Sequence, residues 1–309
     1  MILCVGPAPT VQRSMVFATF TVDQVNRALE VKQNASGKSV NVARVLMTLG
    51  HNVLATGFLG GDSGHFMRHQ LDAETMPHQF IEVPSPTRTC VTITDRQTGT
   101  TTELVEEAAP VGTEYWESLL ALIQQQLAHC QAMVLSGNLS PSSPVDFYAR
   151  CAAMGQKADI AVILDTGGRP LELSLQFAPT LVKPNRQELS QMLKSLIETD
   201  EDLRRAITRL LQLGAKQALI TLGAKGAVFA DPAGLWRLIS PKVAAVNPIG
   251  SGDSVAAGFT AGLVAGKSPI DCAKLGIACG AANALTPTPG VVRMQDVQRL
   301  VDEVRVEPF

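Results

Sequence analysis

The sequence predicts an α/β protein in which helices cover a mostly parallel β-sheet. Short runs rich in alanine, valine, isoleucine and leucine alternate with segments whose apolar residues recur at helical spacing. These runs are nearly continuous in apolar residues, which is typical of strands covered on both faces. The 309 residues, 46% hydrophobic and 17% charged, can bury a large core. We therefore expect one large α/β domain, residues 1–309, with a small appendage.

Individual elements follow from these patterns. The predicted strands are Ile2–Val5, Val53–Phe58, Ala132–Leu135, Ile160–Leu164, Leu181–Val182 and Ala218–Leu222. Helices fit between them, and Gly50 and Gly214 each lie just past a helix end, where glycine is a natural C-terminal cap. The predicted helices are Val40–Leu49, Glu114–Leu127, Pro144–Met154, Gln187–Ile197, Glu201–Leu213 and Pro269–Leu285.

Two regions depart from this alternation. Residues of about 11–34 and about 78–107 contain runs rich in threonine and valine with a period of two, such as Thr89–Thr94. The stretch from Asp95 to Thr100 is typical of a turn. We expect antiparallel strands here, and the two insertions could meet as a small β-sheet lid over one end of the main domain.

The composition argues against nucleic acids and membranes as partners. A net charge of −2 lacks the basic excess of nucleic-acid binders, and 5% aromatic residues leave few platforms for base stacking. The most apolar stretch, Val255–Val264, is too short and too broken by Gly258 and Gly262 to span a bilayer. The N-terminal residues indicate a strand rather than a signal peptide. Six scattered cysteines without a C-x-x-C pair are typical of reduced thiols, so we expect a cytoplasmic protein.

The segment 246–259 holds the strongest candidate site. Gly250 and Gly252 permit backbone conformations closed to other residues, and a helix of small residues begins around Asp253. Backbone N–H groups at such a helix N-terminus form a good anion site. Asp253 is either a helix N-cap or a base that takes a proton from an attacking hydroxyl, while nearby amides hold charge on a phosphoryl group. The residues alone leave both alternatives open.

A resemblance to a known family favours the second alternative. Gly-Ser-Gly-Asp-Ser at 250–254, followed by Ala-Gly-Phe at 257–259, resembles the C-terminal signature of the PfkB carbohydrate kinases in the ribokinase-like superfamily. Asn-Pro-Ile-Gly-Ser-Gly-Asp-Ser is particularly similar to the 1-phosphofructokinase and tagatose-6-phosphate kinase branch. The resemblance implies a three-layer α/β/α ribokinase-like fold, with Asp253 as catalytic base. It also implies an anion hole made by the amides of Gly250, Ser251 and Gly252.

A second motif, residues 36–44, feeds the predicted helix that begins at Val40. It is not a Walker A loop, because the first glycine of that pattern would fall at Lys32 and no strongly apolar strand precedes it. It resembles the PfkB pattern Gly-Gly-Lys-Gly-x-Asn-Val-Ala instead. The resemblance implies that Gly37 and Asn41 contact sugar hydroxyls and that Lys38 meets a substrate or nucleotide phosphate.

Three residues depart from the family pattern in this half of the chain. Ser36 and Ser39 stand where the family usually has glycine. Gln12 stands where it often has an aspartate that binds sugar hydroxyls. A glutamine amide can still hydrogen-bond a hydroxyl, but it carries no charge. These departures bear on the identity of the sugar more than on the chemistry.

The resemblance assigns further residues, each with a simpler structural alternative. Asn185 and Glu188 match an Asn-x-x-Glu motif that helps to position Mg²⁺, although an acid in a first helical turn also suits the helix dipole. The nucleotide pocket would include Lys183, Asn185, Thr221, Gly223 and Gly226. A glycine-containing hairpin turn would explain the last three as well. Arg88 would bind the existing phosphate of the sugar, although an exposed arginine is usually only a solvated charge.

Together these observations predict an ATP- and Mg²⁺-dependent kinase of a sugar phosphate. The acceptor would be a hydroxyl of a ketohexose phosphate, namely fructose 1-phosphate, tagatose 6-phosphate or fructose 6-phosphate. Family members often dimerise through the lid, so we expect a homodimer. Two alternatives remain open: a kinase of a free sugar or nucleoside, and a non-catalytic sugar-phosphate sensor on the same fold.

Overall fold

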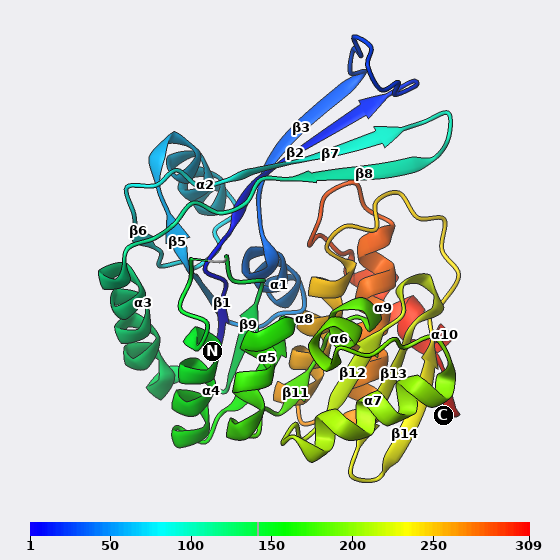
Figure 1. Cartoon of the computed structure of the whole chain (residues 1–309). Helices are drawn as coiled ribbons and strands as arrows, with labels where there is room; N and C mark the ends of the chain where they lie inside the picture. The colour runs from blue at the N-terminus through cyan, green and yellow to red at the C-terminus, as the bar shows by residue number, and fades with distance from the viewer. Residues whose placement is uncertain (141) are drawn as a thin grey trace.

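The computed structural model describes residues 1–140 and 142–309, and a nine-stranded sheet forms the middle layer of its main body (Figure 1). The strand order is β15-β14-β13-β12-β11-β10-β9-β1-β4. The strands from β12 to β4 are parallel, whereas β13, β14 and β15 are antiparallel additions at one edge. Their bounds are β1 Ile2–Val5, β4 Val53–Thr56, β9 Ala132–Ser136, β10 Ala161–Asp165, β11 Leu181–Val182, β12 Ala218–Thr221, β13 Ala227–Asp231, β14 Gly234–Ile239 and β15 Arg305–Pro308.

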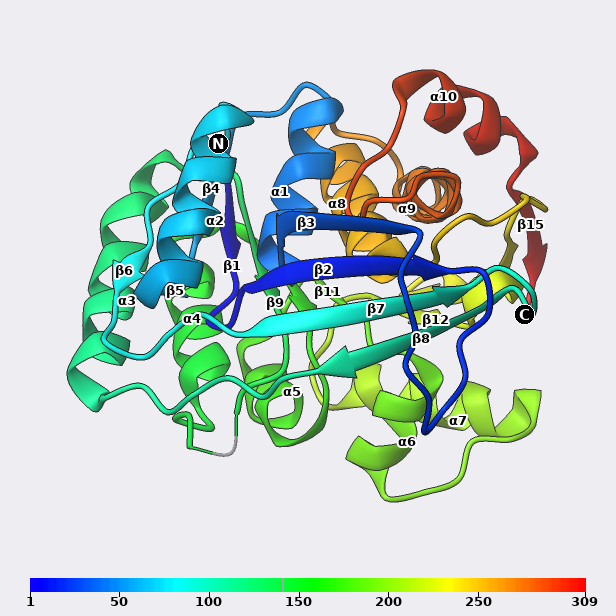
Figure 2. The same ribbon diagram turned by 90° about the horizontal axis from the view of Figure 1, so that it is seen from above.

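Helices cover both faces of this sheet because alternate strand residues face opposite sides. In β1, Ile2 and Cys4 join one buried cluster with α1, α8 and α9, whereas Leu3 and Val5 join a second with α3, α4 and α7. Figure 2 shows the two helical layers on either side of the strands. The helices are α1 Lys38–Thr48, α2 Gly61–Ala73, α3 Thr113–Gln126, α4 Phe147–Lys157, α5 Gly168–Ser174, α6 Arg186–Leu193, α7 Asp200–Gln212, α8 Ser251–Val264, α9 Pro269–Ala284 and α10 Met294–Glu303.

The two β insertions lie side by side in a separate four-stranded sheet, which we call the lid sheet (Figure 1). Its order is β3-β2-β7-β8, with bounds β2 Thr10–Phe17, β3 Glu30–Ser36, β7 Thr89–Asp95 and β8 Thr100–Val105. The expectation of antiparallel strands is wrong for one pair, because β2 and β7 are parallel. Both strands leave the main body at the same end, where the amide of Val11 donates to the carbonyl of Arg88. The turn from Asp95 to Thr100 is confirmed, and the Asp95 carboxylate accepts from the amides of Gln97 and Thr98.

Most predicted main-body elements are present with shifted ends. The predicted helix Gln187–Ile197 ends early as α6, because Lys194 adopts the left-handed conformation that stops a helix. The predicted strand Val53–Phe58 is divided after Thr56, and its last part forms β5 Phe58–Leu59, which pairs with β6 Ile81–Glu82. Within the described ranges, no helix is both long enough and apolar enough to cross a bilayer.

Candidate active site

The candidate base sits in the first turn of α8. Helix α8 begins at Ser251, and its N-cap is Gly250 with a φ of 82°. A Cβ at Gly250 would lie 2.8 Å from the amide nitrogen of Gly290, so the turn requires glycine. Asp253 is therefore two residues inside the helix, and its side chain makes no capping bond. The N-cap alternative for Asp253 is wrong.

Free backbone amides surround this turn. The amide of Ser251 donates to the carbonyl of Pro248 at 3.2 Å. In the part of the chain that the structure describes, the amides of Gly250, Gly252 and Asp253 make no backbone hydrogen bond of this kind. Donors at a helix N-terminus form a favourable place for an anion. Of the three amides expected to hold an anion, that of Ser251 already has a backbone partner, whereas those of Gly250 and Gly252 have none of this kind among the described residues.

The carboxylate of Asp253 is buried and contacts a neutral amide. Asp253 is only 7% exposed. Its Oδ2 accepts a hydrogen bond from Nδ2 of Asn41 at 2.8 Å. The Asn41 Oδ1 in turn accepts from the hydroxyl of Ser36 at 3.0 Å. Burial raises the pKa of Asp253 to about 6, against the opposing effects of Lys38 and the Asn41 hydrogen bond. A carboxylate with such a pKa can accept a proton near neutral pH.

A second buried carboxylate, Asp165 at the end of β10, joins two lysines. Its Oδ1 lies 3.2 Å from Nζ of Lys38 and 3.1 Å from Nζ of Lys183. Burial alone would raise the pKa of Asp165, but the two ammonium groups outweigh it and lower the pKa. Sequence reasoning missed this residue. The available signal was one acid at the carboxyl end of a buried parallel strand, the edge where α/β sheets bind ligands.

A pocket of about 310 Å³ opens beneath the lid sheet on one side of these charges. Lys38 and Arg88 line it, together with two acids of the lid region, Glu103 and Glu107. Ser39 and Ser136 also line it, and their hydroxyls are buried without a hydrogen-bond partner among the described residues. Such hydroxyls are available to bond a polar group or water that enters the pocket. Neither Ser136 nor the two acids were foreseen; we call this cavity the lid pocket.

Of the predicted sugar-site residues, Lys38 and Arg88 belong to the described lining of the lid pocket and the others do not. Arg88 spans its rim, donating to the carbonyls of Glu106 at 3.2 Å and Ala8 at 3.1 Å. Gln12 is 2% exposed and donates to the hydroxyl of Thr92 at 2.7 Å. Gly37 is the N-cap of α1, with a φ of 106°. Gln12, Ser36, Gly37 and Asn41 are absent from the described lining of the lid pocket.

A larger pocket of about 640 Å³ lies on the other side, at the N-terminus of α8. Asn185, Thr221, Gly223, Gly226, Ser251 and Gly252 line it, so most of the predicted nucleotide residues meet there. Lys183 borders this region, since its Nζ lies 3.6 Å from the position of a Cβ on Gly252. We call this cavity the α8 pocket. Its remaining wall is mostly apolar, with residues such as Val255 and Ile277 that suit a flat heterocycle, and also includes Ser240 and Lys242.

The predicted magnesium residues cap α6. The Asn185 Oδ1 accepts from the amide of Glu188, and Glu188 Oε2 accepts from the amide of Asn185, both at 2.8 Å. Among the described residues, no group of three or more histidine, cysteine or acidic side chains could hold a metal ion. Mg²⁺ commonly uses one or two protein oxygens plus water and substrate phosphates. The side-chain oxygens of Asn185 and Glu188 are of the kind that this mode of binding uses.

Comparisons with known proteins identify the family and the fold of the chain. A family model described as pfkB family carbohydrate kinase matches residues 2–291. A phosphofructokinase-2 structure from Escherichia coli in complex with fructose-6-phosphate is 24% identical, with a TM-score of 0.88 over 98% of each chain. A structure named possible 1-phosphofructokinase from Thermotoga maritima is 22% identical, with a TM-score of 0.92 over 100% of this chain and 99% of that one. Arabidopsis thaliana ribokinase complexed with ribose and ATP is 20% identical, with a TM-score of 0.77 over 97% and 98%. At these identities the structures show the ribokinase-like fold, and the family match shows that the chain belongs to the pfkB family of carbohydrate kinases.

Proposed function

We propose that this protein is an ATP-dependent kinase that phosphorylates a hydroxyl of a ketohexose phosphate, namely fructose 1-phosphate, tagatose 6-phosphate or fructose 6-phosphate. One observation carries the proposal. The buried carboxylate of Asp253 lies in a helix turn with free amides, between the lid pocket and the α8 pocket. Asp165 bonds one lysine on each side, Lys38 in the lid pocket and Lys183 beside the α8 pocket. Phosphoryl transfer needs such a base beside an anion site, with one pocket for each substrate.

In the proposed reaction, Asp253 takes the proton of the acceptor hydroxyl as its oxygen bonds to the γ-phosphorus of ATP. The bond between that phosphorus and the oxygen bridging to the β-phosphate breaks, and ADP leaves with the bond electrons. The amides of Gly250 and Gly252 hold the charge on the transferred group, because they point from a helix N-terminus and need no reorganisation. Ser251 anchors the turn through Pro248.

The sugar phosphate would occupy the lid pocket. Arg88 and Lys38 are its cationic lining residues and would bind the existing phosphate. Ser39 and Ser136, with their unpaired hydroxyls, would bind sugar hydroxyls. Gln12, Ser36, Gly37 and Asn41 would contribute further polar contacts, and Gln12 would bond the ligand in place of Thr92.

ATP would occupy the α8 pocket, with Thr221, Gly223, Gly226 and Asn185 along its wall and Lys183 near its phosphates. Mg²⁺, held by Glu188, Asn185 and water, would supply positive charge that neutralises the phosphate oxygens. Lys183 adds a further cation on the same side. The chain would act as one kinase domain, residues 1–309, in the cytoplasm where ATP and sugar phosphates are metabolised.

A homodimer formed through the lid sheet is part of the proposal. The large apolar side chains of Val31 and Leu104 lie on one face of the lid sheet and are 49% and 52% exposed. Exposed apolar side chains gathered on one sheet are typical of an association surface.

A substrate panel tests the proposed function. ADP formation is measured with the three ketohexose phosphates, their unphosphorylated sugars and a nucleoside. We expect turnover with a ketohexose phosphate, and an increase in KM for that substrate in Arg88→Ala that is not seen for uncharged acceptors. Preference for free sugars would favour the alternative, a kinase of an unphosphorylated substrate. The acids Glu103 and Glu107 in the lid pocket are the observation that favours this alternative, because carboxylates repel a phosphate. Binding of a sugar phosphate without turnover would indicate a sensor.

A further inference from the structure

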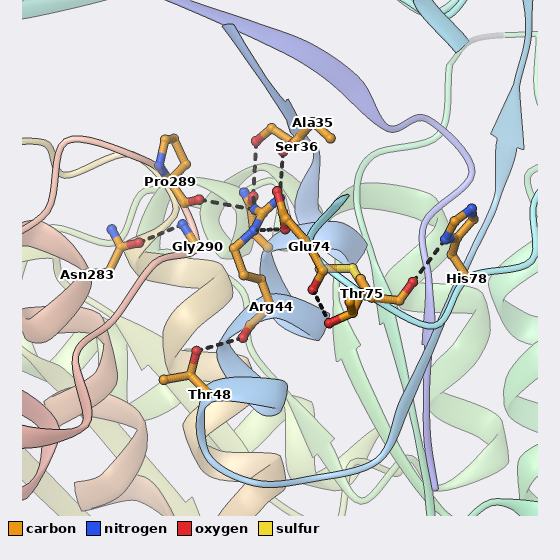
Figure 3. Close-up of polar contacts among 12 residues, drawn as sticks. Ala35, Ser36, Arg44, Thr48, Glu74, Thr75, His78, Asn283, Pro289 and Gly290 are labelled. Atoms are coloured by element: carbon orange, nitrogen blue, oxygen red, sulfur yellow. Dashed lines mark hydrogen bonds and ion pairs between the residues drawn. The ribbon is translucent and has the colours of Figure 1, made fainter. Parts of the chain in front are cut away.

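Arg44 of α1 is absent from the described lining of both pockets, yet its guanidinium joins α1 to three other segments of the chain (Figure 3). Its Nε and Nη2 donate to the two carboxylate oxygens of Glu74, the C-cap of α2, at 2.7 and 3.0 Å. Nη2 also donates to the carbonyl of Ala35 at the end of β3, at 2.8 Å. Nη1 points to the carbonyl of Pro289 and to Oδ1 of Asn41, both at 3.4 Å. The side chain is only 12% exposed, so these contacts hold it in one orientation.

Two neighbours favour the same orientation of the Asn41 amide: Arg44 beside its oxygen and the ionised carboxylate of Asp253 beside its nitrogen. Once Asp253 is protonated it can also donate, so Arg44 is then the neighbour that selects the orientation. A guanidinium can only donate hydrogen bonds, so it selects the amide oxygen as its neighbour. The other neighbour of that oxygen, the Ser36 hydroxyl, can donate or accept and selects neither orientation by itself. With Oδ1 facing Arg44, the amide N–H₂ faces Asp253.

We propose that Arg44 is a positioning residue, which fixes the orientation of Asn41 and thereby keeps an N–H donor on the carboxylate of the base. This inference rests on the proposed function of Asp253. The donor favours the ionised, proton-accepting form of the base. With the amide reversed, its oxygen would accept from protonated Asp253 and would favour the form that cannot act. Glu74 holds the fork of Arg44 in place through two parallel bonds.

The charges that act on Asp253 are Lys38 from α1, Asp165 from β10 and Lys183 from the segment after β11. Arg44 variants leave all three in place. The effect of Arg44 on the base therefore passes through Asn41, which a double-variant cycle can isolate.

The test compares Arg44→Lys with wild type in two measurements. The first is the pH dependence of kcat on the accepted sugar phosphate. The second is the titration of the Asp253 carboxyl carbon by ¹³C NMR, assigned with Asp253→Asn, which needs no turnover. We expect both midpoints to move upward by about one pH unit, because a hydrogen bond to a charged group changes a binding constant by about tenfold or more. The KM for ATP should change by less than about twofold.

Arg150→Lys is the matched control. Arg150 also forms a bidentate pair, with Glu117 on α3 at 2.7 and 2.8 Å, but it lies on α4 away from both pockets. It should leave the midpoint unchanged. Glu74→Gln, which keeps Arg44 but loosens its fork, should give a smaller upward shift and serves if Arg44→Lys folds poorly.

Two outcomes would overturn the proposal. One is an unchanged titration of Asp253 in both Arg44→Lys and Glu74→Gln. The other is a shift of the Asp253 midpoint by Arg44→Lys that is equally large when Asn41 is already replaced by leucine. In that case Arg44 would act on Asp253 by a route other than Asn41. Failure of the kinase proposal looks different: wild type would turn over no acceptor, while the NMR titration would still report the effect of Arg44.

Discussion

Replacing Asp253 with asparagine should remove turnover and, at neutral pH, stabilise the fold. The variant keeps the shape of the side chain and an oxygen that can accept from Asn41, but it cannot take a proton. Loss of a general base costs roughly 100- to 10,000-fold in kcat. The effect on stability follows from burial, which raises the pKa of Asp253 from an ordinary 3.8 to about 6.

The magnitude can be worked from that difference. Each tenfold change in proton affinity is worth about 1.4 kcal/mol, so the raised pKa corresponds to about 3 kcal/mol. Because the folded protein binds this proton more tightly than the unfolded chain, the group favours the fold fully below about pH 4. That contribution is lost as pH rises through about 6. Above that pH, Asp253→Asn avoids the cost of a buried charge and should be more stable by up to about 3 kcal/mol.

The assay is urea unfolding of both proteins between pH 4 and 8, together with ATP turnover. The difference in unfolding free energy should grow with pH and level off above about 6. Asp302→Asn, an exposed position on α10, should show no such trend. An equal or lower stability of Asp253→Asn at pH 8 would refute the electrostatic reasoning, and unchanged turnover would refute the role of base.

Three further predictions concern residues around the base and in the lid sheet. Asp165→Asn should lower the unfolding free energy by roughly 3–5 kcal/mol in urea, because it leaves two ammonium groups without their carboxylate; a loss below about 1 kcal/mol would contradict this. Gly290→Ala should lower kcat by about tenfold or more with little change in ATP affinity, because its Cβ would lie 2.6 Å from Cα of Asn41 at a φ of 71°; wild-type kinetics would show that this contact is unimportant. Leu104→Lys should convert the proposed dimer to monomer by light scattering, and an unchanged dimer mass would place the interface elsewhere.

Local patterns in the sequence were enough for the layered architecture. Strands such as Ile2–Val5 are continuous apolar runs, and helices such as Pro269–Ala284 follow an apolar period, so both signals lie within a few residues. The parallel pairing of β2 with β7 was not foreseen, because it joins segments that are far apart in the chain. The antiparallel edge strand β15 depends in the same way on pairing with β14.

The residues of the candidate site also differ in whether a local sequence pattern or a distant contact gives them their role. Gly250 and Asp253 stand in a local pattern with a physical meaning, a glycine turn that opens a helix. Asp165 has no such pattern, since its importance comes from Lys38, 127 residues away, and from Lys183. The pair Asn185 and Glu188 shows a different limit: the same two residues satisfy a capping box and a metal motif, and spacing alone cannot separate the two.

Asp165 and Asp253 show how one site gives two carboxylates different tasks. Both are buried, so desolvation raises the pKa of each. Asp165 contacts two ammonium groups directly, and this attraction lowers its pKa and keeps it ionised. Among the described residues, the hydrogen-bond partner of the Asp253 carboxylate is the neutral amide of Asn41, so its pKa stays raised, at about 6. Environments that separate the pKa values of neighbouring acids identify which one exchanges protons. The pairing of both lysines with Asp165 is therefore important for the role of Asp253. A lysine in direct contact with Asp253 would lower the pKa of Asp253 and make that carboxylate a weaker base.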